Sequence, residues 1–158
     1  MTLKRDSSIE ILHGFAREVE NTRSLQNEKN IENPKLCNAV SLAFIGDAVF
    51  ELLVRRALIN KQIFSPGELH RQSTKLVCAA SQARAAQALL PVLTDEEADI
   101  YRRGRNANGV HVPKSASAKD YRSATGFEAL FGYLYLKGED ARIADLFEQV
   151  LNVLDGES

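Results

Sequence analysis

Two acidic side chains stand alone in strongly apolar stretches of the sequence. Asp47 lies within AFIGDAVF, and Glu128 is the only charged residue in ATGFEALFGYLYL. An ionised carboxylate among apolar side chains is costly unless it is paired, hydrogen-bonded or bound to a cation. The two carboxylates therefore indicate either ion pairs with distant arginines or a site for a divalent cation, and the sequence leaves both interpretations open.

Glycines accompany both carboxylates and suggest how they meet. Gly46 precedes Asp47, while Gly126 and Gly132 flank Glu128. Because glycine inside a helix costs up to about 1 kcal/mol relative to alanine, it usually marks a close approach between backbones. If the two helices cross there, two carboxylates converge, and carboxylate oxygen is the ligand that Mg²⁺ prefers.

Glu51 is a third acidic candidate on the same stretch. It lies one helical turn after Asp47 and could share its face. Arg55 lies one turn further on, however, and offers an ordinary Glu-to-Arg helix pair. We therefore expect a structural role for Glu51.

The most basic part of the chain is residues 101–122, which carry a net charge of +5. The whole chain has a net charge of −1, because residues 123–158 carry −5. The near-neutral total alone argues against a nucleic-acid-binding protein, yet it conceals a local surface that suits a polyanion. A solvated loop is the alternative. The candidate phosphate-binding side chains are Arg102, Arg103, Arg105, Asn106, Lys114 and Lys119.

The aromatic content of this basic stretch favours a duplex over a single strand. Tyr101 and Tyr121 flank it, but there is no row of aromatic residues on which bases could stack. A duplex recognised through its backbone and shape is the better match.

Several other kinds of site lack sequence support. The three histidines show no metal-ligand spacing, and there is no nucleophile elbow, P-loop or GxGxxG motif. Cys37 and Cys78 lie far apart and outside any zinc motif, so we expect buried, reduced thiols. No stretch is long and apolar enough for a membrane span, and we expect a cytoplasmic protein.

The first half of the chain predicts two long helices. Residues 36–58 are apolar on nearly every face, which is typical of a central helix surrounded by others. Ser65-Pro66-Gly67-Glu68 has the pattern of a capping box, and the helix that it opens should continue to about Leu90, before Pro91.

The second half predicts three more helices. Thr94-Asp95-Glu96-Glu97 is a second capping box and opens a helix that carries the first arginines. Residues 104–118 have the composition of a loop, and helical patterns follow at 119–137, ending at Gly138, and at 140–154.

These patterns indicate an all-α fold. The chain of 158 residues, with 44% hydrophobic and 26% charged residues, has the composition of a single globular domain. No segment alternates as a strand does, so we expect about six or seven helices. Residues 1–34 predict a helical or partly disordered extension, and residues 35–155 the domain itself.

Two motifs resemble those of the ribonuclease III family. LAFIGDAVFELLVRRAL is similar to the family signature ELEFLGDAVLEL, and ATGFEALFGYLYL to its second element, ADxFEALIGAIYLD. Two of the four acidic positions of the family differ, since Ala43 and Thr125 stand where it has a glutamate and an aspartate. The chain also has no room for the family's C-terminal RNA-binding domain. Together with RRGRNAN, these differences resemble the Mini-ribonuclease III branch.

The resemblance implies a single-domain ribonuclease III-like helical fold and an Mg²⁺-dependent endoribonuclease that cuts double-stranded RNA during maturation of large-subunit (23S) ribosomal RNA. Asp47 and Glu128 would be the catalytic residues and metal ligands. The protein would be a homodimer with Phe44 at the interface, and a ribosomal protein is a further possible partner. The alternatives are a catalytically inactive module that binds structured RNA or a ribosomal protein and, last, a plain helical interaction domain.

Overall fold

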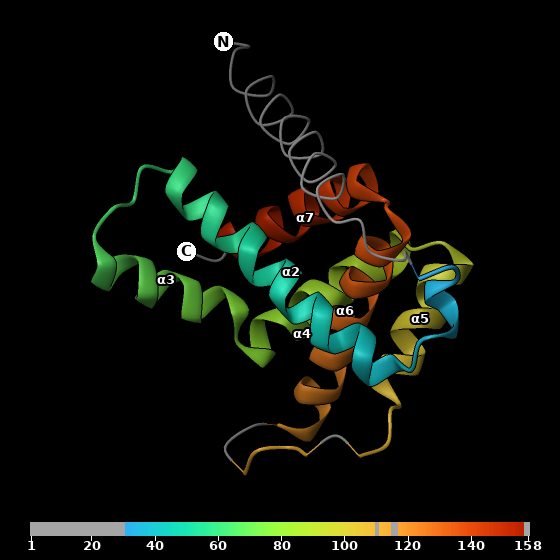
Figure 1. Cartoon of the computed structure of the whole chain (residues 1–158). Coiled ribbons are helices and arrows are strands. Elements are labelled where there is room, and N and C mark those ends of the chain that lie inside the picture. The colour runs from blue at the N-terminus through green and yellow to red at the C-terminus, as the bar shows by residue number, and fades with distance from the viewer. Residues whose placement is uncertain (1–30, 110, 115–116, 157–158) are drawn as a thin grey trace.

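A computed structural model describes residues 31–109, 111–114 and 117–156. Over these residues the chain forms six α-helices and two short 3₁₀ helices, and no strand is present in that part of the chain (Figure 1). The elements are η1 (Pro34–Leu36), α2 (Ala39–Asn60), α3 (Pro66–Val77), α4 (Ala79–Leu89), η2 (Leu90–Val92), α5 (Asp95–Arg105), α6 (Ala118–Lys137) and α7 (Asp140–Asp155). The all-α prediction is confirmed.

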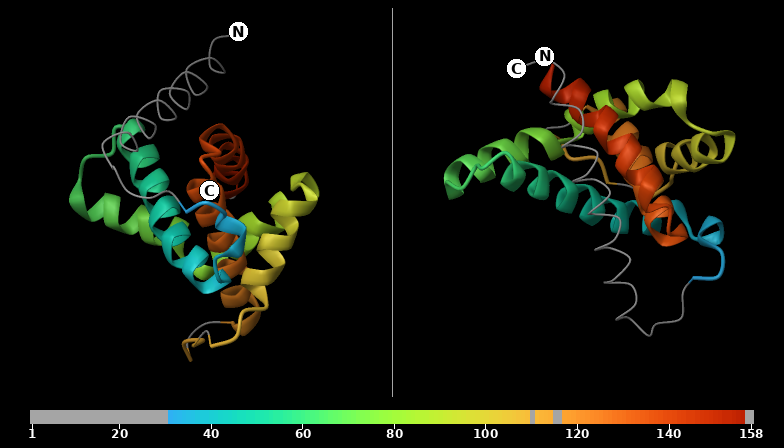
Figure 2. Two further views of the ribbon diagram at one scale, coloured as in Figure 1. Left: turned by 45° about the vertical axis from the view of Figure 1, so that its right-hand side comes forward. Right: turned by 90° about the horizontal axis from the view of Figure 1, so that it is seen from above.

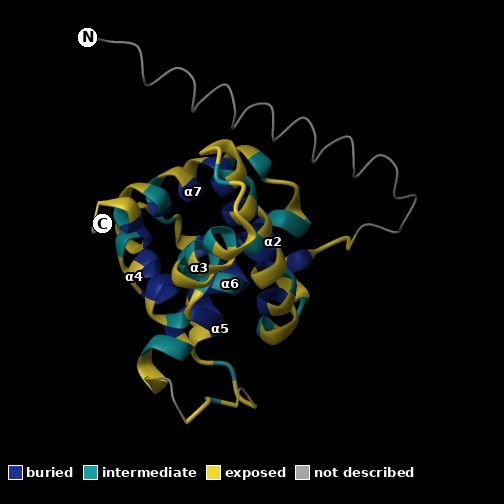
Figure 3. Cartoon of the chain, turned by 90° about the vertical axis from the view of Figure 1, so that its left-hand side faces the viewer, coloured by how far each residue is buried: buried dark blue, intermediate teal, exposed yellow. Residues whose placement is uncertain are grey.

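The central helix is α6, which contacts α2, α4, α5 and α7. From Ser123 to Leu134 every residue of α6 is buried except Glu128. In Figure 3 the buried residues gather in the middle of the bundle, where α6 runs. Glu128 is therefore the exception on an otherwise buried stretch of helix.

The prediction that the first long helix is central is wrong. One side of α2 packs against α6, α3 and α5, but its other side is open. Val40, Phe44 and Leu52 are 46%, 83% and 57% exposed. Apolar residues on every face of α2 thus reflect burial on one side and an uncovered apolar surface on the other.

Four phenylalanines tie α2 to the centre of the fold. The ring of Phe50 on α2 makes edge-on contacts with Phe127, Phe131 and Phe147, at centroid distances of 4.8, 5.7 and 6.0 Å. Such pairs add to the stabilisation that burial of the rings already provides. Because Phe127 immediately precedes Glu128, this cluster also fixes the part of α6 that carries the carboxylate.

The helix predicted from Ser65 to Leu90 is two helices. Cys78, with φ −66° and ψ 154°, is extended and separates α3 from α4. The sequence has no glycine or proline there to signal the break. The Ser81 hydroxyl donates to the Lys75 carbonyl at 2.7 Å and so satisfies the end of α3. Figures 1 and 2 show α3 beside α2 at the edge of the fold.

Two further sequence predictions have mixed outcomes. Ser65 makes no side-chain hydrogen bond at the start of α3, so the capping box predicted there is wrong. Both bonds of the capping box predicted at Thr94 are present at the start of α5.

Both cysteine thiols are free, but the prediction that they are buried is wrong, because Cys37 is half-buried and Cys78 is exposed.

Charged side chains fix α5 against the C-terminal half of the fold. Arg142 on α7 donates to both carboxylate oxygens of Glu97, at 2.8 and 2.9 Å, and to the Val92 carbonyl. Glu96 accepts hydrogen bonds from Lys137 and from Tyr133. These pairs hold the helix from which the arginines of the basic stretch project.

Two predictions concern parts of the chain that the structure describes incompletely. Of the predicted extension over residues 1–34, residues 1–30 lie outside the described residues. Pro34, its last residue, is buried in η1. Among the helices that are described, none is both long and apolar enough to cross a membrane.

Candidate active site

The helices α2 and α6 cross at two glycines. A Cβ atom added to Gly46 would overlap the carbonyl oxygen of Glu128 and lie 2.7 Å from the backbone nitrogen of Gly132. One added to Gly132 would overlap the carbonyl oxygen of Leu42. Only glycine leaves room for this contact. The crossing that the sequence suggested is therefore present, and it is formed by Gly46 and Gly132.

The crossing brings Asp47 and Glu128 together. Asp47 follows Gly46 directly, and Gly46 packs on the backbone of Glu128. Asp47 is exposed and Glu128 is half-buried. Burial and, to a lesser degree, the negative charge of Asp47 raise the pKa of Glu128 to about 7. Burial and then the charge of Glu51 also raise the pKa of Asp47.

No cationic side chain is among the influences on the pKa of either carboxylate, so burial and a neighbouring negative charge raise both values. The sequence left open a pairing of Asp47 and Glu128 with distant arginines, but no arginine of the described residues forms an ion pair with either. Glu51, in contrast, forms the expected ion pair with Arg55, at 2.9 Å. A divalent cation between Asp47 and Glu128 would favour both ionised forms. The donor set therefore fits Mg²⁺.

Neither of the two positions at which the sequence departs from the family pattern supplies a carboxylate. Ala43 is buried and apolar. Thr125 is also buried, and its hydroxyl donates to the Tyr121 carbonyl at 3.0 Å. Among the described residues there is no cluster of three or more acidic, histidine or cysteine side chains that could hold a metal. The protein thus offers two carboxylates, which suits Mg²⁺ because this ion usually keeps several waters and binds substrate phosphate.

Sequence reasoning missed Gln82, which lies on α4 near the carboxylates. The residue is 1% exposed, and its amide lies close enough to Glu128 to oppose the rise in the pKa of Glu128. Its Nε2 atom nevertheless has no hydrogen-bond partner of good geometry among the described residues. The interaction is therefore a polar contact rather than a complete hydrogen bond. Only its polarity in the alanine-rich AASQARAAQAL could have marked it.

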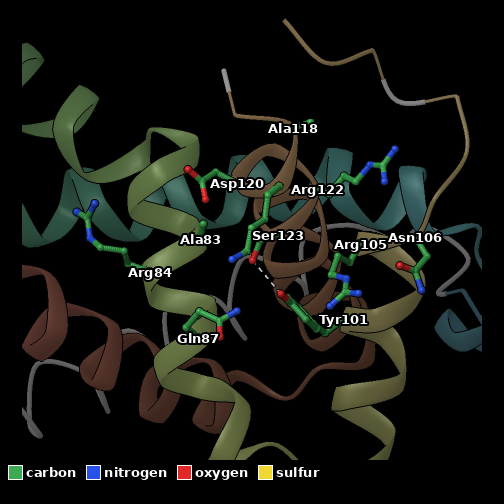
Figure 4. Close-up of a pocket in the computed structure, with 11 residues that line it drawn as sticks. Ala83, Arg84, Gln87, Tyr101, Arg105, Asn106, Ala118, Asp120, Arg122 and Ser123 are labelled. Carbon is green, nitrogen blue, oxygen red and sulfur yellow. Dashed lines mark hydrogen bonds between the residues drawn. The ribbon is translucent and has the colours of Figure 1, made fainter. Parts of the chain in front are cut away.

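A cavity of about 560 Å³ opens between α4, α5 and the first half of α6. In its wall the hydroxyl groups of Tyr101 and Ser123 lie 2.8 Å apart and share a hydrogen bond (Figure 4). Asp120 is the acidic residue among those that line the cavity. The basic lining residues are Arg84, Arg105, Lys119 and Arg122.

The structure brings together only half of the six residues predicted to bind phosphate. Arg105, Asn106 and Lys119 line the cavity. The other three lie apart from it: Arg102 pairs with Asp99, Arg103 donates to the carbonyls of Lys35 and Cys37, and Lys114 is exposed in the loop.

Arg103 and a second glycine contact position α5. The hydrogen bonds of Arg103, at 3.0 and 2.9 Å, fix the segment that leads into α2. A Cβ atom on Gly126 would lie 2.7 Å from the Tyr101 carbonyl oxygen, and one on Gly104 would lie 2.8 Å from the Gly126 Cα atom. This close packing holds the end of α5, where Arg105 lines the cavity.

The exposed side of α2 forms an apolar stripe. Val40, Phe44, Ala48 and Leu52 follow at four-residue spacing, so their side chains lie along one face of the helix. All four residues are exposed. Phe44 has the highest exposed fraction among the large apolar residues of the described chain. An exposed apolar stripe on an otherwise packed helix marks an interaction surface.

Comparisons with known proteins find a matching family model, similar sequences and a similar structure. Residues 40–139 match the family model of the ribonuclease III domain. Curated relatives named Mini-ribonuclease 3 include one from Brevibacillus brevis, 42% identical over 85% of this chain and 100% of the relative. Another, from Streptococcus pneumoniae, is 42% identical over 77% of this chain and 96% of the relative. The crystal structure of a Fusobacterium nucleatum protein matches with a TM-score of 0.69 and 26% identity, covering 79% of this chain and 99% of that protein.

Proposed function

The chain belongs to the ribonuclease III family, and we propose that it is an endoribonuclease that hydrolyses double-stranded RNA with Mg²⁺ held by Asp47 and Glu128. One observation carries the assignment of the site. Two carboxylates with raised pKa values meet at a glycine crossing, and no cationic side chain of the described chain pairs with them. Perturbed acidic groups of this kind concentrate at functional sites.

The proposed mechanism assigns a separate task to each part of the site. Mg²⁺, when bound, would activate the attacking water and stabilise charge on the scissile phosphate and the leaving 3′-oxygen. Asp47 and Glu128 would hold the ion, and the rigid crossing of α2 and α6 would keep their carboxylates at a fixed separation. By family resemblance the products would carry 5′-phosphate and 3′-hydroxyl ends.

The cavity between α4, α5 and α6 would bind the phosphate backbone of the duplex. Its four basic side chains come from three helices and line one cavity. Arg105, Asn106 and Lys119 would contact phosphates there, and Arg84 and Arg122 line the same cavity. Phosphate contacts of this kind position a duplex without reading its sequence.

Homodimer formation is supported by the apolar stripe of α2. Phe44, 83% exposed, lies within that stripe, and a second copy of the chain would cover it. Two active sites would then serve the two strands of one duplex. Analytical ultracentrifugation tests this: the wild type should sediment as a dimer and Phe44→Lys as a monomer.

The proposed substrate is precursor 23S ribosomal RNA, which would place the reaction in the cytoplasm. The relatives named Mini-ribonuclease 3 and the resemblance of the motifs support this proposal. A ribosomal protein bound to that RNA is the proposed helper. Replacement of two family acidic positions by Ala43 and Thr125 favours one competing function, a catalytically inactive module that binds structured RNA.

One assay separates the two functions. Purified protein is incubated with a ribosomal RNA precursor in the presence of Mg²⁺ or EDTA, and RNA binding is measured in parallel. An endoribonuclease cleaves only with Mg²⁺ and loses cleavage in Asp47→Asn, while Asp145→Asn, an exposed change on α7, retains it. Binding without cleavage in Mg²⁺ would establish the inactive module instead.

A further inference from the structure

Gln82 is a buried polar side chain without an evident structural role. It is 1% exposed, and its Nε2 atom has no hydrogen-bond partner among the described residues. A buried amide that gives up its hydrogen bonds to water and gains none is unfavourable. Native proteins retain few such groups, and each one requires a reason.

The packing of α4 does not require a glutamine at this position. The buried residues Ala83, Ala85 and Ala86 allow α4 to approach α6 closely. The preceding Ser81 is also buried, but its hydroxyl donates to the Lys75 carbonyl. Leucine or methionine at position 82 would fill a similar volume and leave no N–H group unpaired. The amide of Gln82 is thus tolerated at a cost to the fold.

The acceptor that the amide faces is the carboxylate of Glu128 on α6. A side-chain hydrogen bond from Gln82 is among the influences on the pKa of Glu128, so the amide, buried on α4, lies within reach of that carboxylate on α6. The contact falls short of full hydrogen-bond geometry.

We infer that Gln82 is a positioning residue for Glu128: its Nε2–H donates to one oxygen of the ionised carboxylate and holds that group in one orientation beside Asp47. The inference rests on the proposed function, because it concerns the same pair of carboxylates. A carboxylate that is already held in place loses less rotamer freedom when it binds a cation. Loss of such a supporting hydrogen bond typically weakens metal binding about 10- to 100-fold.

The test measures metal affinity and stability in the same full-length variants. Mn²⁺, a paramagnetic substitute for Mg²⁺, is titrated into wild type, Gln82→Leu and Gln82→Met in the absence of RNA, and free Mn²⁺ is followed by electron paramagnetic resonance. Thermal unfolding is recorded in EDTA. Asp47→Asn defines the loss of the site, and Gln149→Leu, on α7, is the matched control for the substitution.

The expected result is opposite movement of the two readouts. Both Gln82 variants should bind Mn²⁺ at least about tenfold more weakly than the wild type, while their unfolding temperatures in EDTA stay equal or rise, because without metal the amide has no complete hydrogen bond to lose. Excess Mg²⁺ should restore their cleavage rate, whereas Asp47→Asn should not be rescued.

Other outcomes overturn the inference and remain distinguishable from failure of the proposed function. Wild-type Mn²⁺ affinity in either folded Gln82 variant, or failure of both variants to fold, would assign Gln82 to the core alone. If the wild type binds no more Mn²⁺ than Asp47→Asn, the proposed metal site itself is wrong, and the inference about Gln82 falls with it.

Discussion

Two pairs of carboxylates in this protein occupy contrasting environments. Glu96 and Glu97, at the start of α5, are bonded to Lys137 and Arg142, and these hydrogen bonds lower the pKa of Glu97 and bring that of Glu96 to about 2. At the crossing of α2 and α6, burial raises the pKa of Glu128 to about 7 and also raises that of Asp47. The first pair receives its counter-charge from the chain, and the second does not.

The contrast separates carboxylates that the chain itself neutralises from the carboxylates for which we propose a metal ion. Glu97 is only 5% exposed and Glu128 is half-buried, yet the pKa of Glu97 moves downward because Arg142 donates to its carboxylate. Burial alone therefore does not distinguish the two pairs. The distinguishing feature is whether a cationic side chain accompanies the buried carboxylate.

The largest expected effect is on cleavage. Glu128→Gln should lower the rate about 10³-fold, since a catalytic metal supplies several kcal/mol of transition-state stabilisation, and should leave stability without metal unchanged or higher. Glu97→Gln should have the opposite effects. The cleavage rate per folded molecule should be unchanged, and the free energy of unfolding should fall by about 2–3 kcal/mol because Arg142 loses its partner. Single-turnover kinetics measures the cleavage rate, and urea unfolding measures the free energy of unfolding.

Glu148→Gln, an exposed change on α7, is the control for both substitutions and should alter neither property. The contrast between the two pairs breaks down if Glu97→Gln abolishes cleavage in a folded protein, or if Glu128→Gln destabilises the fold as much as Glu97→Gln does.

The second effect concerns the crossing that forces the unpaired carboxylates together. Gly46→Ala places a Cβ atom against the Glu128 carbonyl, and backbone cannot move aside cheaply. Stability should fall by about 3 kcal/mol or more, and Mg²⁺-dependent cleavage should fall with it. Gly67→Ala, where a Cβ atom meets nothing within 4 Å, should be neutral or slightly stabilising. Equal unfolding free energies for the two variants would disprove the close crossing.

The sequence predicted much of this arrangement because local patterns determine it. Asp47 and Glu128 stand out as charges in apolar helices, the Thr94 capping box is read from four adjacent residues, and Gly138 ends α6 with φ 85°. Gly46 and Gly132 indicated a close crossing, because glycine inside a helix has few other uses.

The remainder depends on contacts between distant segments. The break at Cys78 has no local signal and follows from packing and from Ser81. Nothing in the sequence near Arg103 shows that its side chain bonds the carbonyls of Lys35 and Cys37. The role of Gln82 appears only when α4 is placed against Glu128. The apolar pattern of α2 could not distinguish a core helix from one with an open side.

A third and smaller effect extends the contrast to the cations. Arg142 is paired within the fold, whereas Arg105 and Arg122 line the cavity and make no ion pair with the described residues. Arg105→Ala and Arg122→Ala should each weaken binding of duplex RNA several-fold and reduce the slope of log K against log salt by about 1. Arg71→Ala, on α3 and paired with Glu68, should leave both unchanged. An unchanged salt slope in both cavity variants would exclude these phosphate contacts.

The smallest effect is the dependence of stability on pH in the absence of metal. In the folded protein Glu128 takes up its proton near pH 7, and in the unfolded chain near its ordinary value of 4.5. Between these values the folded state binds more protons, so the free energy of unfolding should decrease as pH rises from about 4.5 to about 7. Glu97 has a lowered pKa and acts in the opposite sense: its stabilisation is present above about 4.5 and is lost as pH falls.

Urea unfolding in EDTA across this range, compared between wild type and Glu128→Gln, isolates the contribution of the one carboxylate because all other groups are shared. The wild type should lose stability relative to the variant as pH rises towards 7, and added Mg²⁺ should restore it, since a cation favours the ionised form. Parallel curves for the two proteins would mean that Glu128 is compensated within the fold as Glu97 is, and the contrast between the two carboxylate pairs would then have no electrostatic basis.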